Sequence, residues 1–476
     1  MKRERKMSSV CDLTAIEMLE AFRSKELSPV DVILAVIERA HAIQSPLNAF
    51  CHIDEKGALA AARASEKAWH SGENIRRMEG VPVSIKDVTT VKGWHLGRGS
   101  LTSEGNPPAA ADSPSVERLR GAGAVLFAST TSCEGGWKAV TDSPRTGITR
   151  NPYDPRKTPG GSSGGAAVAV ACGAGPIALG SDGGGSIRIP ASFTGIFGFK
   201  PQYGRVPQYP LGAHYTNMSH QGPITRCADD AALALEVMAG KHPLDADTLP
   251  SFGLEDFASV GELSLTGMRI GVTLDFGFMA IDPEIAQLFK RLPDLLRDLG
   301  AEVVQMDGLQ DWRPTYRTLW QAGAAQAIRR LAPELRDKVD PGFRAVAAQG
   351  EEIGIKQYLE ANMERIGYKL QCSQLFATFD AVISPTVAVL PFSAGVDVPS
   401  PECADWLDWA GISLLGNLTG LPAASMPFGY SSSGLPVGIQ VLGASHDDIK
   451  VLRICKALEN VNVCSDHRPS AVFAGV

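Results

Sequence analysis

The sequence predicts an α/β fold, a single large domain in which a mixed, mostly parallel β-sheet core is covered by α-helices. Helical and strand patterns alternate along the chain, as where a helix at 114–120 is followed by a strand at 124–128. Such alternation is typical of a largely parallel or mixed sheet with helices on its faces. The length of 476 residues would allow about three domains of ~150 residues. The sequence contains no linker, low-complexity segment or internal repeat, and we therefore expect one domain.

Capping signals place the first helices. Thr14 and Glu17 form the pattern of a capping box, which starts a helix. Ser28 followed by Pro29 caps a second helix, because proline fits the first helical position. A third helix is expected at 58–69.

The next apolar segment alternates with a period of two residues. Val81, Val83 and Ile85 predict a strand, and Lys86 stands at its end, where a side chain can enter a cleft. Further strands are expected at 177–179, 268–274, 301–306 and 381–383. Further helices are expected at 166–172, at 226–240, from Asp282 with a kink at Pro293, and over most of 312–379.

Composition indicates an ordinary soluble globular protein, with 44% hydrophobic and 20% charged residues. The net charge of −7 argues against nucleic acid or an anionic membrane as the main partner. No run of about eighteen apolar residues could span a membrane, and the basic start MKRERKMSSV lacks the apolar segment of a secretory signal. Nine cysteines without a CxxC pair suit reduced thiols. We therefore expect a cytoplasmic protein.

Two clusters rich in glycine and serine, 160–165 and 181–186, organise the centre of the chain. Glycine lets the backbone adopt positive φ and lets other groups approach it closely. The three glycines directly before Ser186 could therefore turn several N–H groups toward one point, and such an array stabilises an oxyanion. Ser186, at the end of the array, is well placed to be a nucleophile.

A serine hydroxyl needs a base to become a good nucleophile. None of the nine histidines lies in a motif, and those nearest to the glycine clusters are His95, His214 and His220. Lysine can serve as the base when it is neutral, and burial lowers its pKa in that direction. Lys86 follows an apolar strand and is the other candidate base.

Two other interpretations of the glycines are weaker. The segment 160–164 fits G-x-S-x-G, the nucleophile elbow of α/β-hydrolases, but that elbow follows a strand. Here the proline-rich segment 151–159 precedes it and predicts a loop. No G-x-x-x-x-G-K-[ST] sequence is present, so a phosphate-binding P-loop is not expected.

The stretch 158–201 closely resembles the signature of the amidase signature family, GGSSGG…G-S/T-D-x-GGS-I-R-x-P…G-x-KP. The resemblance extends to both ends of the chain and is weakest from about 208 to 379. It implies the amidase signature fold in one domain over 1–476. The parts implied are N-terminal helices at 1–78, a catalytic core at 79–207, a more variable helical region at 208–379, and C-terminal core strands and a helix at 380–470.

In that family the catalytic residues are a lysine, a serine held by a cis peptide bond and a nucleophilic serine. By position the resemblance assigns these roles to Lys86, Ser162 and Ser186. Neutral Lys86 would take a proton from Ser162, and Ser162 would take one from Ser186, which attacks the acyl carbon and forms an acyl-enzyme. The implied oxyanion hole consists of the N–H groups of Gly183, Gly184, Gly185 and Ser186, and the implied supporting residues are Ser163, Asp182 and Arg188.

The resemblance also implies a substrate pocket lined partly by the loop 133–138, upstream of the first glycine cluster. The expected wall residues are Gly135, Gly136, Trp137, Ile189, Phe193 and Tyr209. The run 137–144 resembles broad-range amidases and aryl acylamidases. The Ser-Thr-Glu-Asn-Ser type of sequence that is usual in glutamine-processing members is absent there.

The predicted function is therefore hydrolysis of carbon–nitrogen bonds in non-peptide amides, aryl or alkyl, with esters and carbamates (urethanes) as further substrates. The predicted partners are a small-molecule amide, ester or carbamate, with no nucleic acid, membrane, cofactor or metal, and the chain would be a monomer or homodimer. One alternative is the amidase (glutaminase) subunit of a tRNA-dependent amidotransferase. Another is a non-catalytic binding protein on the same scaffold, against which the intact catalytic set argues.

Overall fold

A mixed β-sheet runs through the part of the chain that the computed structural model describes, residues 10–210, 217–253, 257, 259–261, 264–462, 464 and 469. In chain order its strands are β1 (Phe50–Ile53), β2 (Pro82–Lys86), β3 (Val125–Thr130), β6 (Ile177–Asp182), β7 (Phe197–Lys200), β8 (His220–Thr225), β9 (Arg269–Val272), β10 (Glu302–Gln305), β11 (Ala381–Pro385), β12 (Ala423–Tyr430) and β13 (Pro436–Gly443). Within the sheet these eleven strands lie in the order β1-β3-β2-β6-β8-β7-β12-β13-β11-β9-β10. A separate small sheet pairs β4 (Asp142–Ser143) with β5 (Gly147–Ile148).

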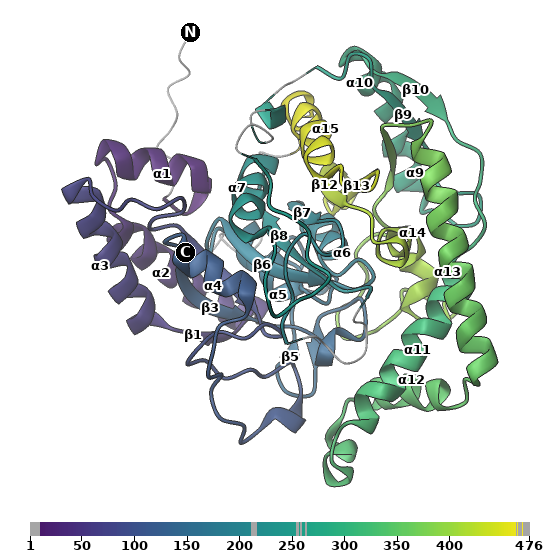
Figure 1. Ribbon diagram of the computed structural model, residues 1–476, viewed down its shortest axis with the longest axis horizontal. Coiled ribbons are helices and arrows are strands. Elements are labelled where there is room, and N and C mark those ends of the chain that lie inside the picture. The colour runs from purple at the N-terminus through teal and green to yellow at the C-terminus, as the bar shows by residue number, and fades with distance from the viewer. Residues whose placement is uncertain are drawn as a thin grey trace.

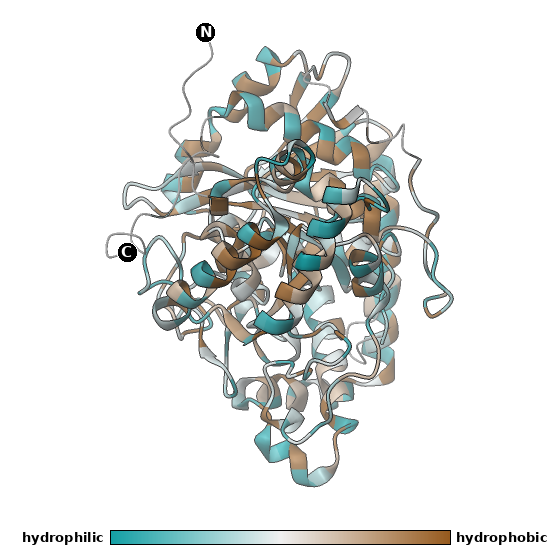
Figure 2. Ribbon diagram, turned by 90° about the vertical axis from the view of Figure 1, so that its left-hand side faces the viewer, coloured by the Kyte–Doolittle hydropathy of each residue, from teal (hydrophilic) through white to brown (hydrophobic). Residues whose placement is uncertain are grey.

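Helices surround the sheet, with the first three at the β1 edge and those between residues 283 and 376 at the opposite side (Figure 1). They are α1 (Ala15–Ser24), α2 (Pro29–Leu47), α3 (Glu55–Ser71), α4 (Pro114–Gly121), α5 (Gly164–Ala171), α6 (Arg188–Phe193), α7 (Ala228–Met238), α9 (Pro283–Phe289), α10 (Leu292–Asp298), α11 (Arg313–Arg329), α12 (Pro341–Glu351), α13 (Ile355–Phe376), α14 (Trp406–Thr419) and α15 (Asp448–Val461). Figure 2 shows hydrophobic and hydrophilic residues alternating along the outer helices, as expected for helices that cover a core with one face.

The predicted α/β fold with a mixed sheet is confirmed, but its strands are not mostly parallel. Among the described strands of the large sheet, six neighbouring pairs are antiparallel and four are parallel. The parallel pairs join β3, β2 and β6 on one side and β11, β9 and β10 on the other, where the alternation of helix and strand predicted them. The centre is antiparallel, and there a tight turn at 431–434 joins β12 directly to β13 as a hairpin.

The capping predictions are confirmed at both early helices. Thr14 accepts a hydrogen bond from the Glu17 N–H while the Glu17 carboxylate accepts one from the Thr14 N–H, and Ser28 caps α2. The predicted kink at Pro293 is instead a break between α9 and α10. Pro293 lies in the first turn of α10, where its missing N–H leaves no hydrogen bond unmade.

The helix α5 consists only of glycine, alanine and valine, and it is buried along its whole length. Its small residues let neighbouring segments approach closely, since a Cβ at Gly165 would lie 2.3 Å from Thr131 Oγ1. Ser162 and Ser163 directly precede this helix. Because β2 and β6 are parallel neighbours, Lys86 and Asp182, the last residues of the two strands, lie at the same edge of the sheet.

Candidate active site

Lys86 ends β2 and is completely buried. Its Nζ lies 2.6 Å from Ser162 Oγ and 3.0 Å from Ser181 Oγ. Burial lowers the pKa of Lys86 from 10.5 to about 7, although the charges of Cys133 and Asp182 act to raise it. An amine with this pKa is substantially neutral near pH ~7, so Lys86 can accept a proton from Ser162.

The two serine-bearing segments are tied together. A cis peptide bond joins Gly161 to Ser162. The Ser163 N–H donates to Ser186 O at 3.2 Å, which connects the first glycine cluster to the second. Ser163 Oγ donates to Ser181 O at 3.1 Å, a carbonyl that the lysine also contacts. Ser163 therefore lies within the lysine site, where the resemblance implied it.

The implied proton relay has two links, from Lys86 to Ser162 and from Ser162 to Ser186. The structure forms the first of these hydrogen bonds but not the second. No hydrogen bond joins Ser162 Oγ to Ser186 Oγ within the described ranges. The Ser186 residue is 7% exposed, whereas the lysine is completely buried. Catalytic hydrogen bonds often become short only when substrate is bound. The second proton transfer therefore needs the two hydroxyl groups to approach each other.

The loop 182–186 is held rigidly by distant side chains. Three donors on α11 and α14 bind consecutive carbonyl oxygens: Asn417 Nδ2 on Asp182 O at 2.8 Å, Tyr316 Oη on Gly183 O at 2.5 Å, and Ser413 Oγ on Gly184 O at 2.6 Å. The C=O and N–H of a trans peptide point in opposite directions. The N–H groups of the following residues therefore face away from these donors.

One of the predicted oxyanion donors is already engaged. Gly185 N donates to Asp182 Oδ1 at 2.6 Å, so this N–H does not face an oxyanion, and its assignment is corrected. The N–H groups of Gly183, Gly184 and Ser186 have no hydrogen-bond partner in the described part of the chain. These three groups are the candidate oxyanion donors.

Asp182 and Arg188 form a completely buried, bidentate ion pair. The Nε–Oδ2 and Nη2–Oδ1 distances are both 2.9 Å. Burial raises the pKa of Asp182, but the charge and hydrogen bonds of Arg188 outweigh burial and hold this pKa well below its usual range. Arg188 also donates to Gln440 and Asn417, at 2.5 Å each. The pair therefore anchors the glycine loop to α14 and β13, as expected of supporting residues.

An aromatic cover over the glycine loop was not predicted from the sequence. Tyr316 and Trp320 of α11 and Trp406 of α14 pack against one another with ring centroids 5.3 to 6.2 Å apart. A Cβ at Gly184 would lie 2.6 Å from Tyr316 Oη and 2.7 Å from the Trp406 ring, so only glycine fits there. The sequence held a signal for this cover, because Trp312, Tyr316 and Trp320 recur every four residues on one helix face.

Of the predicted wall residues on the loop 133–138, Gly136 lies beside the relay and Trp137 packs into the core. A Cβ at Gly136 would lie 3.2 Å from Ser162 Oγ, so the glycine brings the loop 133–138 against the relay. The Trp137 ring stacks on Phe343 with centroids 6.0 Å apart, and Trp137 is only 4% exposed. Gly135, between Glu134 and Gly136, lines a pocket together with residues of the segment 96–109 and of α11 and α12.

The remaining wall residues do not form an open surface. Ile189 packs under the glycine loop, where its Cδ1 lies 2.7 Å from the position of a Cβ at Gly185. The Phe193 ring stacks on Trp409 with centroids 6.0 Å apart and is completely buried in the core. Tyr209 is 45% exposed, and no hydrogen bond or ring contact joins it to the site within the described residues. The structure therefore does not bring Tyr209 into the site.

The histidines are placed in structural roles. His95 Nε2 lies 3.0 Å from Ser103 O. His220 Nδ1 lies 3.3 Å from Asp182 O, and burial lowers the pKa of His220 well below its usual value. Neither histidine contacts a serine of the site, and His214 lies outside the described residues.

The described residues form neither a metal site nor a membrane-spanning helix. No cluster of three or more His, Cys, Asp or Glu side chains within the described ranges could hold a metal ion. In the same part of the chain, no helix combines the length and the apolar character needed to cross a membrane. All nine cysteines are free thiols.

Several known proteins resemble this chain over nearly its whole length. The A subunit of glutamyl-tRNA(Gln) amidotransferase from Chloroflexus aurantiacus is 31% identical over 495 residues, which cover 98% of this chain and 100% of that protein. The structure of a bacterial aryl acylamidase superposes with a TM-score of 0.88 at 29% identity, covering 98% of this chain and 99% of the other. The corresponding amidotransferase protein of Thermotoga maritima superposes with a TM-score of 0.79 at 30% identity, covering 96% of each chain.

The relatives that are named as amidotransferase subunits correct one prediction. Their name refers to a tRNA and to one part of a larger assembly, whereas the sequence predicted small-molecule partners only, no nucleic acid, and a monomer or homodimer. That prediction of partners is wrong. The predicted enzyme class and the resemblance to the amidase signature are confirmed, because the family model described as Amidase matches residues 31–452. This chain belongs to the Amidase family of amidase signature enzymes.

Proposed function

We propose that this chain cleaves amide carbon–nitrogen bonds through an acyl-enzyme on Ser186. The observation that carries the proposal is the completely buried Lys86, whose Nζ lies 2.6 Å from Ser162 Oγ. Burial lowers the pKa of this lysine to about 7, so it can act as a base where an ordinary surface lysine would be charged. Membership of the Amidase family supports the same chemistry.

The proposed reaction begins when neutral Lys86 takes a proton from Ser162 Oγ while Ser162 takes one from Ser186 Oγ. Ser186 Oγ then bonds to the acyl carbon, and the electron pair that moves to the carbonyl oxygen is stabilised by N–H donors of Gly183 and Gly184 together with that of Ser186. When the carbon–nitrogen bond breaks, Ser162 passes a proton to the nitrogen, because an amine leaves poorly as an anion. Water, deprotonated by the same relay, releases the acid from Ser186.

For the biological role, we propose the amidase (glutaminase) subunit of a tRNA-dependent amidotransferase. The support is the similarity to the A subunits of glutamyl-tRNA(Gln) amidotransferases, at 31% identity over 98% of this chain in Chloroflexus aurantiacus. In this role the amide is a primary one, and the nitrogen that leaves the acyl-enzyme is ammonia. The role also calls for protein partners, since the relatives are named as subunits.

Ammonia release from glutamine tests this proposal. A coupled glutamate dehydrogenase assay on the purified chain should detect ammonia, and Ser186→Ala should abolish the release while the unfolding transition stays unchanged. Tagged chain recovered from its own cells should bring other subunits with it. Release that persists in Ser186→Ala would exclude the assigned nucleophile, and recovery of the chain alone would argue against the subunit role.

A second candidate function is hydrolysis of aryl or alkyl amides, with esters and carbamates as further substrates. The observation that favours it is the run 137–144, which resembles broad-range amidases and aryl acylamidases and lacks the sequence that is usual in glutamine-processing members. The similarity to an aryl acylamidase, with a TM-score of 0.88, supports it further. A panel of anilide, primary amide, ester and carbamate separates the candidates. Fast anilide cleavage without glutamine cleavage would favour the second function.

A further inference from the structure

A turn between β2 and α4 presents one long side chain. Gly97 and Gly99 both donate their N–H groups to the Asp87 carboxylate, at 2.8 and 3.2 Å. Neither glycine can carry a side chain, because a Cβ at Gly97 would lie 2.6 Å from Asp87 Oδ2 and one at Gly99 would lie 2.6 Å from Ser132 O. Arg98, between them, is therefore the position of this turn from which a side chain extends.

The backbone at Arg98 is itself unusual. Its φ of +52° lies in the left-handed region, which favours glycine and asparagine over residues with a long side chain. The Asp87 carboxylate fixes this conformation by binding the N–H groups on both sides of it. Residues that their surroundings hold in this region cluster at active sites and ligand-binding sites.

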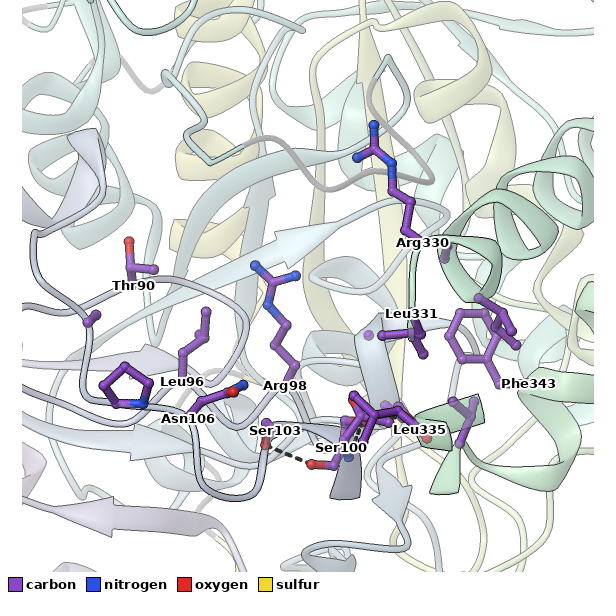
Figure 3. A pocket seen from close by; sticks show the side chains of 18 residues that line it. Thr90, Leu96, Arg98, Ser100, Ser103, Asn106, Arg330, Leu331, Leu335 and Phe343 are labelled. Carbon is purple, nitrogen blue, oxygen red and sulfur yellow. Dashed lines mark hydrogen bonds between the residues drawn. The ribbon is translucent and has the colours of Figure 1, made fainter. Parts of the chain in front are cut away.

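The Arg98 side chain lines a pocket with a volume of about 590 Å³, which is enough for a small substrate. One wall is the loop 96–109, and the facing wall comes from the end of α11 and from α12, with Arg330 and Phe343 (Figure 3). Figure 3 shows the Arg98 and Arg330 side chains extending in the same direction, one from each wall. Arg330 is exposed, whereas Arg98 is partly buried.

The Arg98 guanidinium has no hydrogen-bond or ion-pair partner in the described part of the chain. The nearby carboxylates are engaged elsewhere, Asp87 by the turn and Glu134 by Ser100 Oγ at 2.5 Å and Asp340 N at 2.6 Å. Burial lowers the pKa of the guanidinium, although the charge of Asp87 acts against this shift. A partly desolvated guanidinium whose N–H groups have no partner among the described residues favours a carboxylate, which fits its two parallel N–H donors.

The pocket shares a wall with the active site. Gly135 lines the pocket, and its N–H donates to Arg98 O at 2.8 Å. The next residue, Gly136, is the one whose Cβ would lie 3.2 Å from Ser162 Oγ. We propose that Arg98 binds the carboxylate of an amide substrate whose amide group is cleaved at Ser186. This inference rests on the proposed function and adds to it the residue and the pocket that bind the carboxylate of the substrate.

A matched pair of substrates tests the inference. Glutaramate (5-amino-5-oxopentanoate) is a primary amide with a terminal carboxylate, and pentanamide has the same chain length without it. The parent enzyme should cleave glutaramate with the higher kcat/KM. Arg98→Gln should reduce the ratio of the two kcat/KM values by about 10- to 100-fold, since it removes a charge-assisted hydrogen bond. Arg98→Lys keeps the positive charge but loses the two parallel N–H donors of the guanidinium, and it should give an intermediate ratio of the two kcat/KM values.

The control variant is Arg150→Gln, which removes a partly buried arginine that contacts Pro155 O outside the pocket. Its ratio should equal that of the parent. All three variants should show the same unfolding transition as the parent. If Arg98→Gln does not fold, Arg98→Lys takes its place in the test, and its glutaramate-to-pentanamide ratio should lie below that of the parent. A parent enzyme without preference for glutaramate, or an Arg98→Gln enzyme with an unchanged ratio, would overturn the inference.

A binding measurement separates this inference from the proposed function. In the Ser186→Ala chain, calorimetry with glutaramate reports affinity without turnover, and adding Arg98→Gln should weaken binding by at least about tenfold. That result would support the carboxylate site even if no amide were cleaved, in which case the proposed function alone would fail. Propionate should compete with glutaramate. If propionate instead accelerates pentanamide cleavage, the site is regulatory and the substrate assignment is wrong.

Discussion

Replacing Lys86 with methionine tests the neutral-base mechanism through protein stability. Burial lowers the pKa of Lys86 from 10.5 to about 7, so between these pH values the folded chain binds fewer protons than the unfolded chain. The stability of the parent therefore rises with pH across this window. At about 1.36 kcal/mol per pKa unit, the burial of Lys86 costs about 4 kcal/mol at pH ~7 and nothing above pH ~10.5.

Methionine has a similar length and is never charged, so the variant does not carry this cost. It does lose the hydrogen bonds of Nζ to Ser162 Oγ and Ser181 Oγ, which contribute about 1 kcal/mol each when the amine is neutral. Lys86→Met should therefore be about 2 kcal/mol more stable than the parent at pH ~7 and about 2 kcal/mol less stable near pH ~10.5. The sign of the stability difference between the two chains reverses with pH. Only the parent carries the Lys86 amine, whose loss of a proton changes its stability over this range.

Urea unfolding of both chains from about pH 6 to about pH 10 measures this difference directly. Lys86→Met should be inactive throughout. The matched control is Lys67→Met, at an exposed lysine of α3, which reports the effect of the same substitution outside the site. A Lys86→Met chain that is inactive and less stable than the parent at every pH would show that Lys86 is a charged structural partner, and the neutral-base mechanism would have to be abandoned.

Three further predictions address the relay. Ser186→Ala should abolish turnover without changing the unfolding transition, and a fluorophosphonate probe should label Ser186 alone; labelling of Ser162 would contradict the assignment. Lys86→Ala and Ser162→Ala should each lower kcat by several orders of magnitude, and the double variant should lose little more, because both act in one relay. If the double variant showed the product of the two losses, the residues would act independently. The rate should rise with pH through an acid limb near pH ~7, where Lys86 becomes neutral, and then level off. His95→Asn and His220→Asn should leave the limb in place, and a displaced limb in either variant would identify that histidine as the titrating group.

Elements with local signals were predictable from the sequence, and β8 shows why others were not. The capping box at Thr14 needs only residues within one helical turn, so its outcome does not depend on the rest of the fold. The strand β8 reads HQGPIT, and glycine and proline argue against a central strand. It is nevertheless central, between β6 and β7, because a Cβ at Gly222 would lie 2.2 Å from Phe199 O and only glycine allows that approach.

The candidate site was predictable as far as its residues are adjacent in the sequence. The glycine clusters pointed to an oxyanion loop and a nucleophile on chemical grounds, whereas Lys86, which lies 76 residues before Ser162, gained its role from the family resemblance. Only the folded chain shows that the lysine is completely buried. Burial is what makes the lysine a base, and it depends on packing that no local pattern encodes.

The correction at Gly185 follows from the same property that made the glycine loop recognisable. Glycine leaves the peptide planes free to rotate, so a run of three glycines allows many arrangements of N–H groups and specifies none. The arrangement is selected by Tyr316, which lies 133 residues from Gly183, and by Ser413, which lies 229 residues from Gly184. These donors hold the carbonyl oxygens and so direct the N–H groups to the other side. The glycines therefore allow the peptide planes of the loop to rotate. Side chains of α11 and α14, which come from regions without a recognised catalytic motif, determine which N–H groups can stabilise an oxyanion.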